Sequence, residues 1–152
     1  EERIIACDVY EIERVMLNLL SNAIKFIESE GKVEVNIKNT EEKVIISVRD
    51  NGIGIPKHMT NTIFDRFKRV DSSLRRNHEG SGIGLSIVKS IVEMHGGKVF
   101  LKSQIGKGSE FTFELPVDLI DDSESKKKIL VDRDISADRI NIEFSDIYEL
   151  YN

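Results

Sequence analysis

One stretch of the chain, residues 8–27, spaces its apolar side chains as an amphipathic helix does, and this pattern limits the possible folds most strongly. Asp8 is placed to cap the helix, with Glu11 three residues later as in a capping box, and we expect Gly31 to end it. A helix with one apolar face needs a second layer against that face. Its apolar positions are Ile12, Val15, Met16, Leu19, Leu20, Ala23, Ile24 and Ile27.

The predicted second layer is a β-sheet, because several short stretches show strand patterns. These stretches cover residues 3–7, 33–37, 44–48, 99–101 and 111–115. A short helix is expected around residues 61–67, and a longer one from Gly84 to His95 that ends at Gly96-Gly97. Since strands and helices do not alternate as βαβ units, the sequence predicts an α+β fold, a two-layer sandwich with a mixed, mainly antiparallel sheet.

The composition changes after Pro116, and this change predicts the end of the folded domain. Residues 117–128 hold an acidic cluster followed by three lysines, which is typical of a solvated linker. Residues 129–152 regain apolar alternation and are compatible with a docked strand. We therefore expect a domain over residues 1–116, a linker, and a C-terminal extension of unassigned role.

Charge and composition exclude several classes of protein. A net charge of −5 argues against general nucleic-acid binding. No apolar run approaches the roughly 20 residues that cross a bilayer, so we expect a cytoplasmic domain, with any membrane anchor outside this sequence. The single cysteine, Cys7, lies in an apolar stretch and is expected to be a buried thiol.

Three motifs carry side chains that suit a nucleotide and its metal. Asn18, Asn22 and Lys25 share one helix face; amide oxygens suit Mg²⁺ and a lysine suits phosphate, although a plain polar face remains the alternative. Residues 50–56 follow a strand, and the carboxylate of the first residue, Asp50, can accept a hydrogen bond from an amino group. An ordinary Asn-Gly turn at residues 51–52 is the alternative, and it explains part of this motif. Residues 80–86 open a helix whose N–H groups favour an anion, which alone is weak evidence.

Together, the order and spacing of these motifs resemble the GHKL ATPase and kinase superfamily, and most closely the bacterial histidine kinases of two-component systems. The resemblance runs from about residue 4 to residue 116. It is carried by an N box at 18–26, a G1 box at 50–56, an F box at 64–67, a G2 box at 80–85, and closing segments at 95–97 and 106–109. It implies the Bergerat type of α/β sandwich, with helices on one face of the sheet and a lid over residues 68–81.

The resemblance implies that ATP and Mg²⁺ are bound. Asn22, with Asn18 close by, would hold Mg²⁺, and Asp50 would accept from the adenine amino group. The residues expected to take part in catalysis are Asn18, Lys25 and Arg69. Those expected to contact the nucleotide are Asn22, Lys25, Phe26, Asp50, Gly52, Gly54, Ile55, Phe67, Arg69, Gly80, Ser81, Gly82, Ile83, Gly84, Leu85 and Ser109.

Position 18 distinguishes branches of the superfamily. Hydrolysing relatives such as DNA gyrase carry a glutamate there to activate water, whereas Asn18 is no general base and Glu13 lies on another helix face. The resemblance thus implies transfer of the γ-phosphate to a histidine of a dimerisation and phosphoacceptor domain that is absent from this chain, and onward to a response regulator. None of His58, His78 and His95 lies in an acceptor motif.

The resemblance further implies that the full-length kinase is a homodimer, whereas this chain is expected to be monomeric and to have little kinase activity alone. Two other functions stay open at this point. One is a serine kinase of the anti-sigma-factor type, and the other is a module that senses ATP without catalysis.

Overall fold

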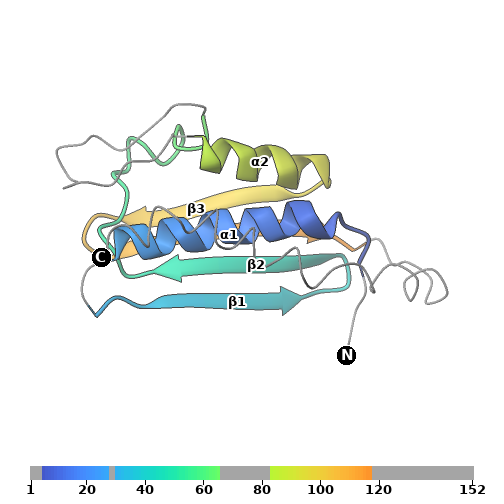
Figure 1. Ribbon diagram of the computed structural model, residues 1–152, viewed down its shortest axis with the longest axis horizontal. Helices are drawn as coiled ribbons and strands as arrows, with labels where there is room; N and C mark the ends of the chain where they lie inside the picture. The colour runs from blue at the N-terminus through green and yellow to red at the C-terminus, as the bar shows by residue number, and fades with distance from the viewer. Residues whose placement is uncertain (1–4, 28–29, 66–82, 118–152) are drawn as a thin grey trace.

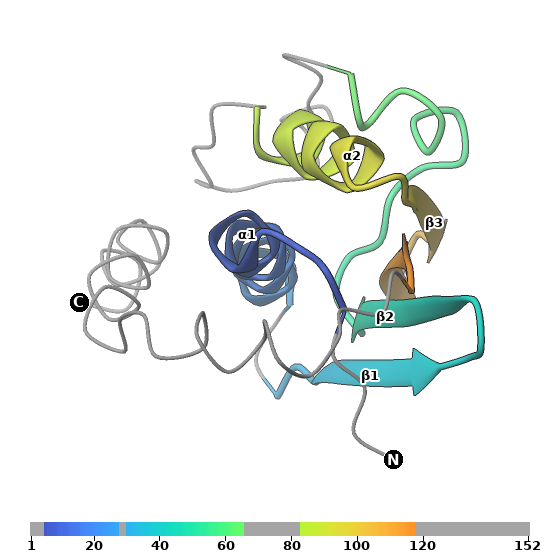
Figure 2. The ribbon, with the colours of Figure 1, turned by 90° about the vertical axis from the view of Figure 1, so that its right-hand side faces the viewer.

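The structure, a computed structural model, describes residues 5–27, 30–65 and 83–117. Its elements are α1 (Val9–Phe26), β1 (Val33–Asn39), β2 (Lys43–Asp50), α2 (Gly84–Met94), β3 (Lys98–Gln104) and β4 (Gly108–Pro116). The strands form one sheet in the order β1-β2-β4-β3, and each described pair is antiparallel. Both helices lie on one face of this sheet (Figures 1 and 2). The predicted two-layer α+β sandwich is confirmed.

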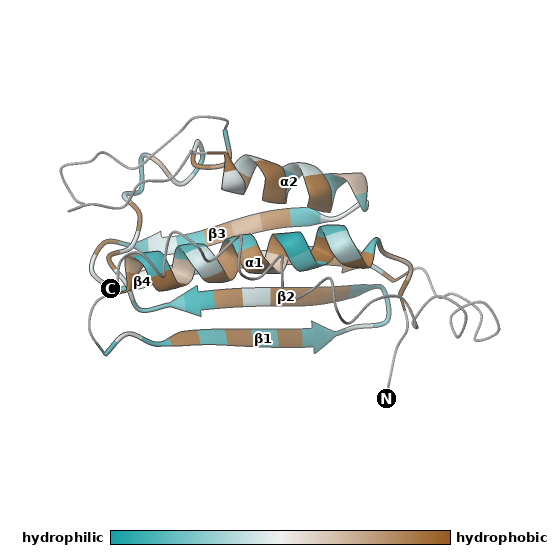
Figure 3. Cartoon of the chain, in the orientation of Figure 1, coloured by the Kyte–Doolittle hydropathy of each residue, from teal (hydrophilic) through white to brown (hydrophobic). Residues whose placement is uncertain are grey.

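The core lies between the helices and the inner face of the sheet. Val15 and Leu19 of α1 are at most 1% exposed, as are Val48 of β2, Val88 of α2 and Phe113 of β4. Apolar residues alternate with polar ones along β1, as Figure 3 shows, whereas β2 carries three consecutive apolar residues, Val44, Ile45 and Ile46. Burial of the apolar side of the sheet against the helices is the driving force for the two-layer packing.

The start of α1 confirms the predicted cap and corrects half of it. The Asp8 side chain accepts hydrogen bonds from the N–H groups of Tyr10 (3.0 Å) and Glu11 (3.2 Å). In a capping box the Glu11 carboxylate would accept from the Asp8 N–H. Instead, the Asp8 N–H donates to Nε2 of His95 at the far end of α2 (3.1 Å).

The end of α1 was predicted wrongly. The helix ends at Phe26, and Ile27 is already extended, with φ −81° and ψ 150°. The Phe26 carbonyl accepts a hydrogen bond from the Ile53 N–H (3.0 Å). A tertiary contact therefore satisfies a carbonyl at the helix end, several residues before Gly31.

The end of α2 confirms the glycine signal. Gly96 has φ +71°, and its N–H donates to the Glu93 carbonyl (3.0 Å), while the Gly97 N–H donates to the Val92 carbonyl (2.9 Å). This is a Schellman motif. His95 Nδ1 lies 2.8 Å from the Ile91 carbonyl and must donate to it. Nε2 is then the atom that accepts from the Asp8 N–H, so the His95 ring joins the start of α1 to the end of α2.

Other predictions were only partly right. The described part of the helix expected over residues 61–67 consists of turns, with bonds such as Met59 N–H to Pro56 O and Thr62 N–H to Met59 O. The strand expected over residues 3–7 is reduced, among described residues, to one bridge position at Ile5.

Cys7 is only partly buried, and its burial raises the pKa of its thiol. The predicted lid, linker and C-terminal extension lie outside the described residues. In the described ranges no helix has the length and apolar character needed to cross a bilayer.

Candidate nucleotide-binding site

The first and third predicted motifs meet where α1 faces the beginning of α2. A Cβ atom placed on Gly84 would collide with Oδ1 of Asn18. Only a glycine lets the first residue of α2 come this close to the Asn18 amide. The amide group of the N box therefore lies directly against the helix that the G2 box opens, as expected if both contact one ligand.

The first turn of α2 offers unpaired backbone donors. Its N-cap residue is Ile83, which supplies no side-chain cap. Within the described residues the N–H groups of Gly84 and Leu85 have no acceptor, and Ser86 uses its hydroxyl to donate to the Ile83 carbonyl (2.7 Å). Open N–H groups at a helix start favour an anionic group such as phosphate.

Asp50 forms a buried acceptor at the end of β2. The residue is 5% exposed, and its Oδ1 accepts from the N–H groups of Gly52 (2.9 Å) and Ser109 (3.2 Å). Burial raises the pKa of this carboxyl, which the two backbone N–H groups partly offset. Within the described residues Oδ2 has no donor. An amino group of a ligand would complete its hydrogen bonding.

The second motif is held by backbone packing on both sides. A Cβ on Gly52 would collide with the Phe26 carbonyl, and one on Gly54, which has φ +71°, with the Gln104 carbonyl. The Ile53 carbonyl also accepts from the Gly106 N–H (2.8 Å). These contacts give a packing reason for both glycines that the sequence analysis did not identify, and their role beside the adenine stays a prediction.

A pair of serines supports this turn from β3 and β4. Ser103 Oγ accepts from the Ile55 N–H (2.7 Å) and donates to the Gly108 carbonyl (2.9 Å). Ser109 Oγ lies 2.9 Å from Ser103 Oγ and must donate to it, because the one Ser103 proton is already used. The Ser109 oxygen can then only accept from a ligand or water. Ser103 was missed, although its position opposite Ser109 in the hairpin register would have identified it.

The residues present fit Mg²⁺ and ATP. The predicted metal ligands Asn18 and Asn22 are neutral and half-buried, and share the α1 face that carries Lys25. The nearest described carboxylate on that face is Glu11, which lies two turns from Asn18, about 10 Å along the axis. The predicted acceptor, phosphate donors and metal ligands thus lie on β2, α2 and α1, and the fold brings α1 and the start of α2 into contact at Asn18 and Gly84.

The other predicted residues divide into two groups. Ile55 is 9% exposed and belongs to the hydrophobic core. Leu85 packs partly against that core. The remaining predicted residues lie outside the described ranges, so the structure does not place them: Phe67, Arg69, Gly80, Ser81 and Gly82.

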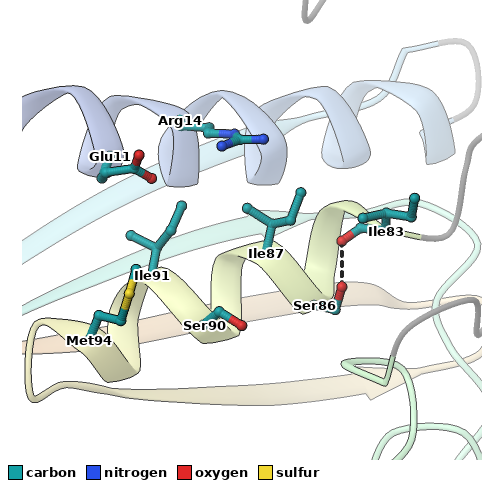
Figure 4. Close-up of a pocket in the computed structure, with 8 residues that line it drawn as sticks. All are labelled: Glu11, Arg14, Ile83, Ser86, Ile87, Ser90, Ile91 and Met94. Carbon is teal, nitrogen blue, oxygen red and sulfur yellow. Dashed lines mark hydrogen bonds between the residues drawn. The ribbon is translucent and has the colours of Figure 1, made fainter.

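A groove of about 360 Å³ runs between α1 and α2, as Figure 4 shows. It is not the predicted nucleotide site, with which it shares Ile83. Apolar side chains of α2 form one wall, and Met94 at its end is 74% exposed. Glu11 and Arg14 of α1 form the other wall. The sequence alone does not reveal this groove, because its wall residues continue the apolar period of α2.

Known proteins resemble this chain in sequence and in structure. The family model described as histidine kinase-, DNA gyrase B- and HSP90-like ATPase matches residues 7–119. The circadian input-output histidine kinase CikA of Synechococcus elongatus is 39% identical over 72% of this chain and 14% of its own length. The sensor histidine kinase WalK of Bacillus subtilis is 43% identical over 72% of this chain and 18% of its own length. The chain thus spans less than a fifth of these relatives.

Two solved structures show the same fold. The mycobacterial sensor histidine kinase MprB has a TM-score of 0.68 at 30% identity, over 76% of this chain and 78% of that one. Full-length ShkA, crystallised in complex with AMPPNP, has a TM-score of 0.62 at 32% identity, over 72% of this chain and 22% of that one. The chain therefore belongs to the histidine kinase-, DNA gyrase B- and HSP90-like ATPase family, and within it to the catalytic domains of histidine kinases.

Proposed function

We propose that this domain binds Mg·ATP and presents the γ-phosphate to a histidine on a dimerisation and phosphoacceptor domain. The observation that carries the proposal is the contact of Asn18 with Gly84 at the open start of α2. Phosphate donors lie there beside a neutral amide, at the position where hydrolysing relatives have a glutamate. Such a site binds a phosphoryl group without activating water against it.

The adenine, the phosphates and the metal ion each have a proposed partner among the described residues. Asp50 Oδ2 would accept from the adenine amino group, and the N–H groups of Gly84 and Leu85 would donate to phosphate oxygens. Asn22, with Asn18 beside it, would hold Mg²⁺, and Lys25 would approach the phosphates. When bound, Mg²⁺ neutralises charge on the phosphate oxygens.

Transfer to histidine fits the lack of a general base at position 18. A neutral imidazole nitrogen can attack the γ-phosphorus itself: a P–N bond forms, the bond to the β–γ bridging oxygen breaks, and ADP leaves. Among the described residues, Glu13 lies on another face of α1 and Glu11 is two turns away. The site therefore orients the γ-phosphate and leaves the nucleophile to the partner domain.

The groove between α1 and α2 gives the acceptor domain a place to bind. It begins at Ile83, next to the proposed phosphate site, and ends at the exposed Met94. An acceptor helix with apolar side chains would contact the α2 wall and bring its histidine toward the first turn of α2. ATP and acceptor would then reach the same helix start from different sides.

The test is a phosphotransfer assay with γ-labelled ATP and a dimerisation domain taken from a related histidine kinase. We expect acid-labile, base-stable label on that domain, because phosphohistidine hydrolyses in acid. Acid-stable label would identify a serine kinase, and tight ATP binding with no label on any acceptor would identify a sensing module. Either result overturns the proposal.

The proposed metal site is tested by Asn22→Ala, with Asn36→Ala on the exposed strand β1 as its control. We expect Asn22→Ala to abolish Mg²⁺-dependent ATP binding in calorimetry, and Asn36→Ala to leave it unchanged. Unaltered binding by Asn22→Ala would remove Asn22 from the metal site. Phosphotransfer by the same variants shows whether binding and transfer are lost together.

A further inference from the structure

Three polar side chains form one row across the inner face of the sheet, at the end where the turn of residues 50–56 begins. Asp50 of β2 lies opposite Ser109 of β4, which in turn lies opposite Ser103 of β3. Residues directly opposite each other in antiparallel strands point to the same face, with Cβ atoms about 4.5–5.5 Å apart. Asp50 and Ser109 are both buried. The proposed adenine acceptor therefore has a buried hydroxyl as its neighbour.

Ser103 stands at the other end of this row and fixes the direction of the Ser109 hydroxyl. Its Oγ lies 2.9 Å from the Gly108 carbonyl oxygen and 2.9 Å from Ser109 Oγ. A carbonyl has no proton, so the contact with Gly108 takes the single proton of Ser103. The contact between the two hydroxyls must then take the proton of Ser109. Ser109 Oγ is left with lone pairs only, and within the described residues no donor reaches them.

We propose that Ser103 is a positioning residue that makes the site select a purine with a 6-amino group over one with a 6-carbonyl group. The inference rests on the proposed function, since it takes the base to lie beside Asp50. By holding the Ser109 proton, Ser103 turns Ser109 Oγ into a second acceptor next to the Asp50 carboxylate. An amino group carries two N–H donors and can satisfy both acceptors, directly or through one water. A carbonyl oxygen in the same place meets two acceptors and is disfavoured.

The same hydroxyl also supports the turn that follows Asp50. Ser103 Oγ accepts from the Ile55 N–H (2.7 Å), and Ile55 is 9% exposed. A Cβ atom on Gly108 would collide with the Asp50 carbonyl, so β4 packs closely against the end of β2 at this point. Loss of the Ser103 hydroxyl therefore has two separable effects. A weaker turn lowers the affinity for every nucleotide, whereas a released Ser109 proton changes the preference among them.

The experiment compares the affinities of the full chain for Mg·ATP and Mg·ITP in calorimetry. ITP carries a carbonyl oxygen where ATP carries the amino group. We expect the wild type to prefer ATP, and Ser103→Ala to reduce this preference about 2- to 12-fold, the range for one hydrogen bond between neutral groups. The reason is that the released Ser109 hydroxyl can donate to the carbonyl. If Ser103→Ala weakens both nucleotides by the same factor, Ser103 only supports the turn, and the proposal is overturned.

Two control variants separate the hydroxyl from the loss of a serine in a strand. Ser103→Thr keeps a hydroxyl at this position and should keep the wild-type ratio of the two affinities. Ser47→Ala removes a serine that is 9% exposed on β2, next in sequence to the core residue Val48 and therefore on the other face of the sheet. It should also leave the ratio unchanged. A fall in the ratio as large as that of Ser103→Ala in either control would contradict the proposal.

Ser109→Ala gives a second test that leaves both backbone bonds of Ser103 in place. It removes the second acceptor, so we expect the preference for ATP to fall here too, and an unaltered ratio would overturn the proposal. In the Ser109→Ala background, Ser103→Ala should not change the ratio further, and an additional fall would contradict coupling through Ser109. A wild-type chain that binds no Mg·ATP overturns the proposed function and this inference together. ATP binding with an unaltered ratio in the variants overturns this inference alone.

Discussion

Among single residues, Asp50 combines a proposed binding role with a cost to stability. Its Oδ1 is held by two backbone N–H groups, and its burial raises the pKa of the carboxyl. We expect Asp50→Asn to weaken ATP binding by about 1.5–3 kcal/mol, because the amide no longer offers a charged acceptor to the adenine amino group. Calorimetric titration with ATP and GTP measures this. The wild type should prefer ATP, since the guanine carbonyl would face the Asp50 carboxylate, and equal affinities would refute this role.

The same substitution should not lower the free energy of unfolding. The amide oxygen of the introduced asparagine can accept the same two backbone bonds, and no charge is then buried. Because the folded-state pKa of Asp50 is raised, its contribution to stability is fully present below the pKa in the unfolded chain and is lost as pH rises through the folded-state pKa. Urea unfolding at pH 4 and pH 7 should show this loss in the wild type, and a smaller one in Asp50→Asn. Equal pH dependence in both proteins would contradict it.

Gly84 and Asn18 form a pair whose substitutions should not be additive. Gly84→Ala places a methyl group against Asn18 Oδ1, and we expect it to cost about 1–3 kcal/mol of stability through overpacking. In an Asn18→Ala background that oxygen is gone. The same change should then be neutral or stabilising, since alanine favours a helix over glycine by up to about 1 kcal/mol. Unfolding of the four proteins in urea gives the coupling energy, and additive effects would show that the contact is absent.

Among the elements, the two helices are joined at one end by His95. Its ring donates to the Ile91 carbonyl and accepts from the Asp8 N–H. We expect His95→Ala to lower the free energy of unfolding by about 0.5–1.5 kcal/mol and to speed amide exchange at Asp8, which loses its acceptor. His58→Ala is the matched control, because His58 is exposed and should not contribute. Unchanged exchange at Asp8 in the His95 variant would rule out the link.

The helices and turns also show which sequence signals are sufficient to predict where an element begins and ends. Asp8 and Gly96 act through backbone groups close to them in sequence, so the start of α1 and the end of α2 could be predicted. The end of α1 could not, because Ile53 is far along the chain from the Phe26 carbonyl that it satisfies. The turns around Met59 were predicted as a helix for a related reason. Their apolar residues pack on the core, Ile63 at 6% exposure, without needing helical geometry.

In the whole molecule, the proposed acceptor groove and nucleotide site share α2 but should be separable by mutation. Met94→Glu changes the exposed end of the groove, and we expect the rate of phosphotransfer to fall about 10- to 150-fold, since a lost apolar contact is worth about 1.5–3 kcal/mol. ATP affinity should stay unchanged. Phe100→Glu, 46% exposed on the other face of the sheet, is the control for added charge. Equal rates for both variants would place the acceptor elsewhere.

In the candidate site, as in the fold, features that depend on nearby sequence could be predicted, and features that depend only on contacts between distant elements could not. Motif order predicted that Asn18 and the start of α2 lie together, and the structure places Gly84 against Asn18; that Asp50 belongs to the same site stays a prediction. The sequence did not show why Gly52 and Gly54 are glycines, because the carbonyls that they approach come from α1 and β3. Ser103 was likewise missed, since its role depends on strand register. Residues proposed to touch a ligand thus have clearer sequence signals than those that support them.

The position of Asp50 opposite Ser109 also bears on how the protein folds. Each hairpin, β1–β2 and β3–β4, forms between neighbouring stretches of chain, but the pairing of β2 with β4 joins residues at least 59 positions apart, the separation of Asp50 and Ser109. Closing so long a loop is slow, because the chain loses conformational entropy before the hydrogen bonds and packing of the paired strands can offset that loss. The proposed adenine acceptor, Asp50, gains its hydrogen bond from the Ser109 N–H only after that closure. Nucleotide added during refolding should therefore leave the early hairpins unaffected and stabilise only molecules that have joined them.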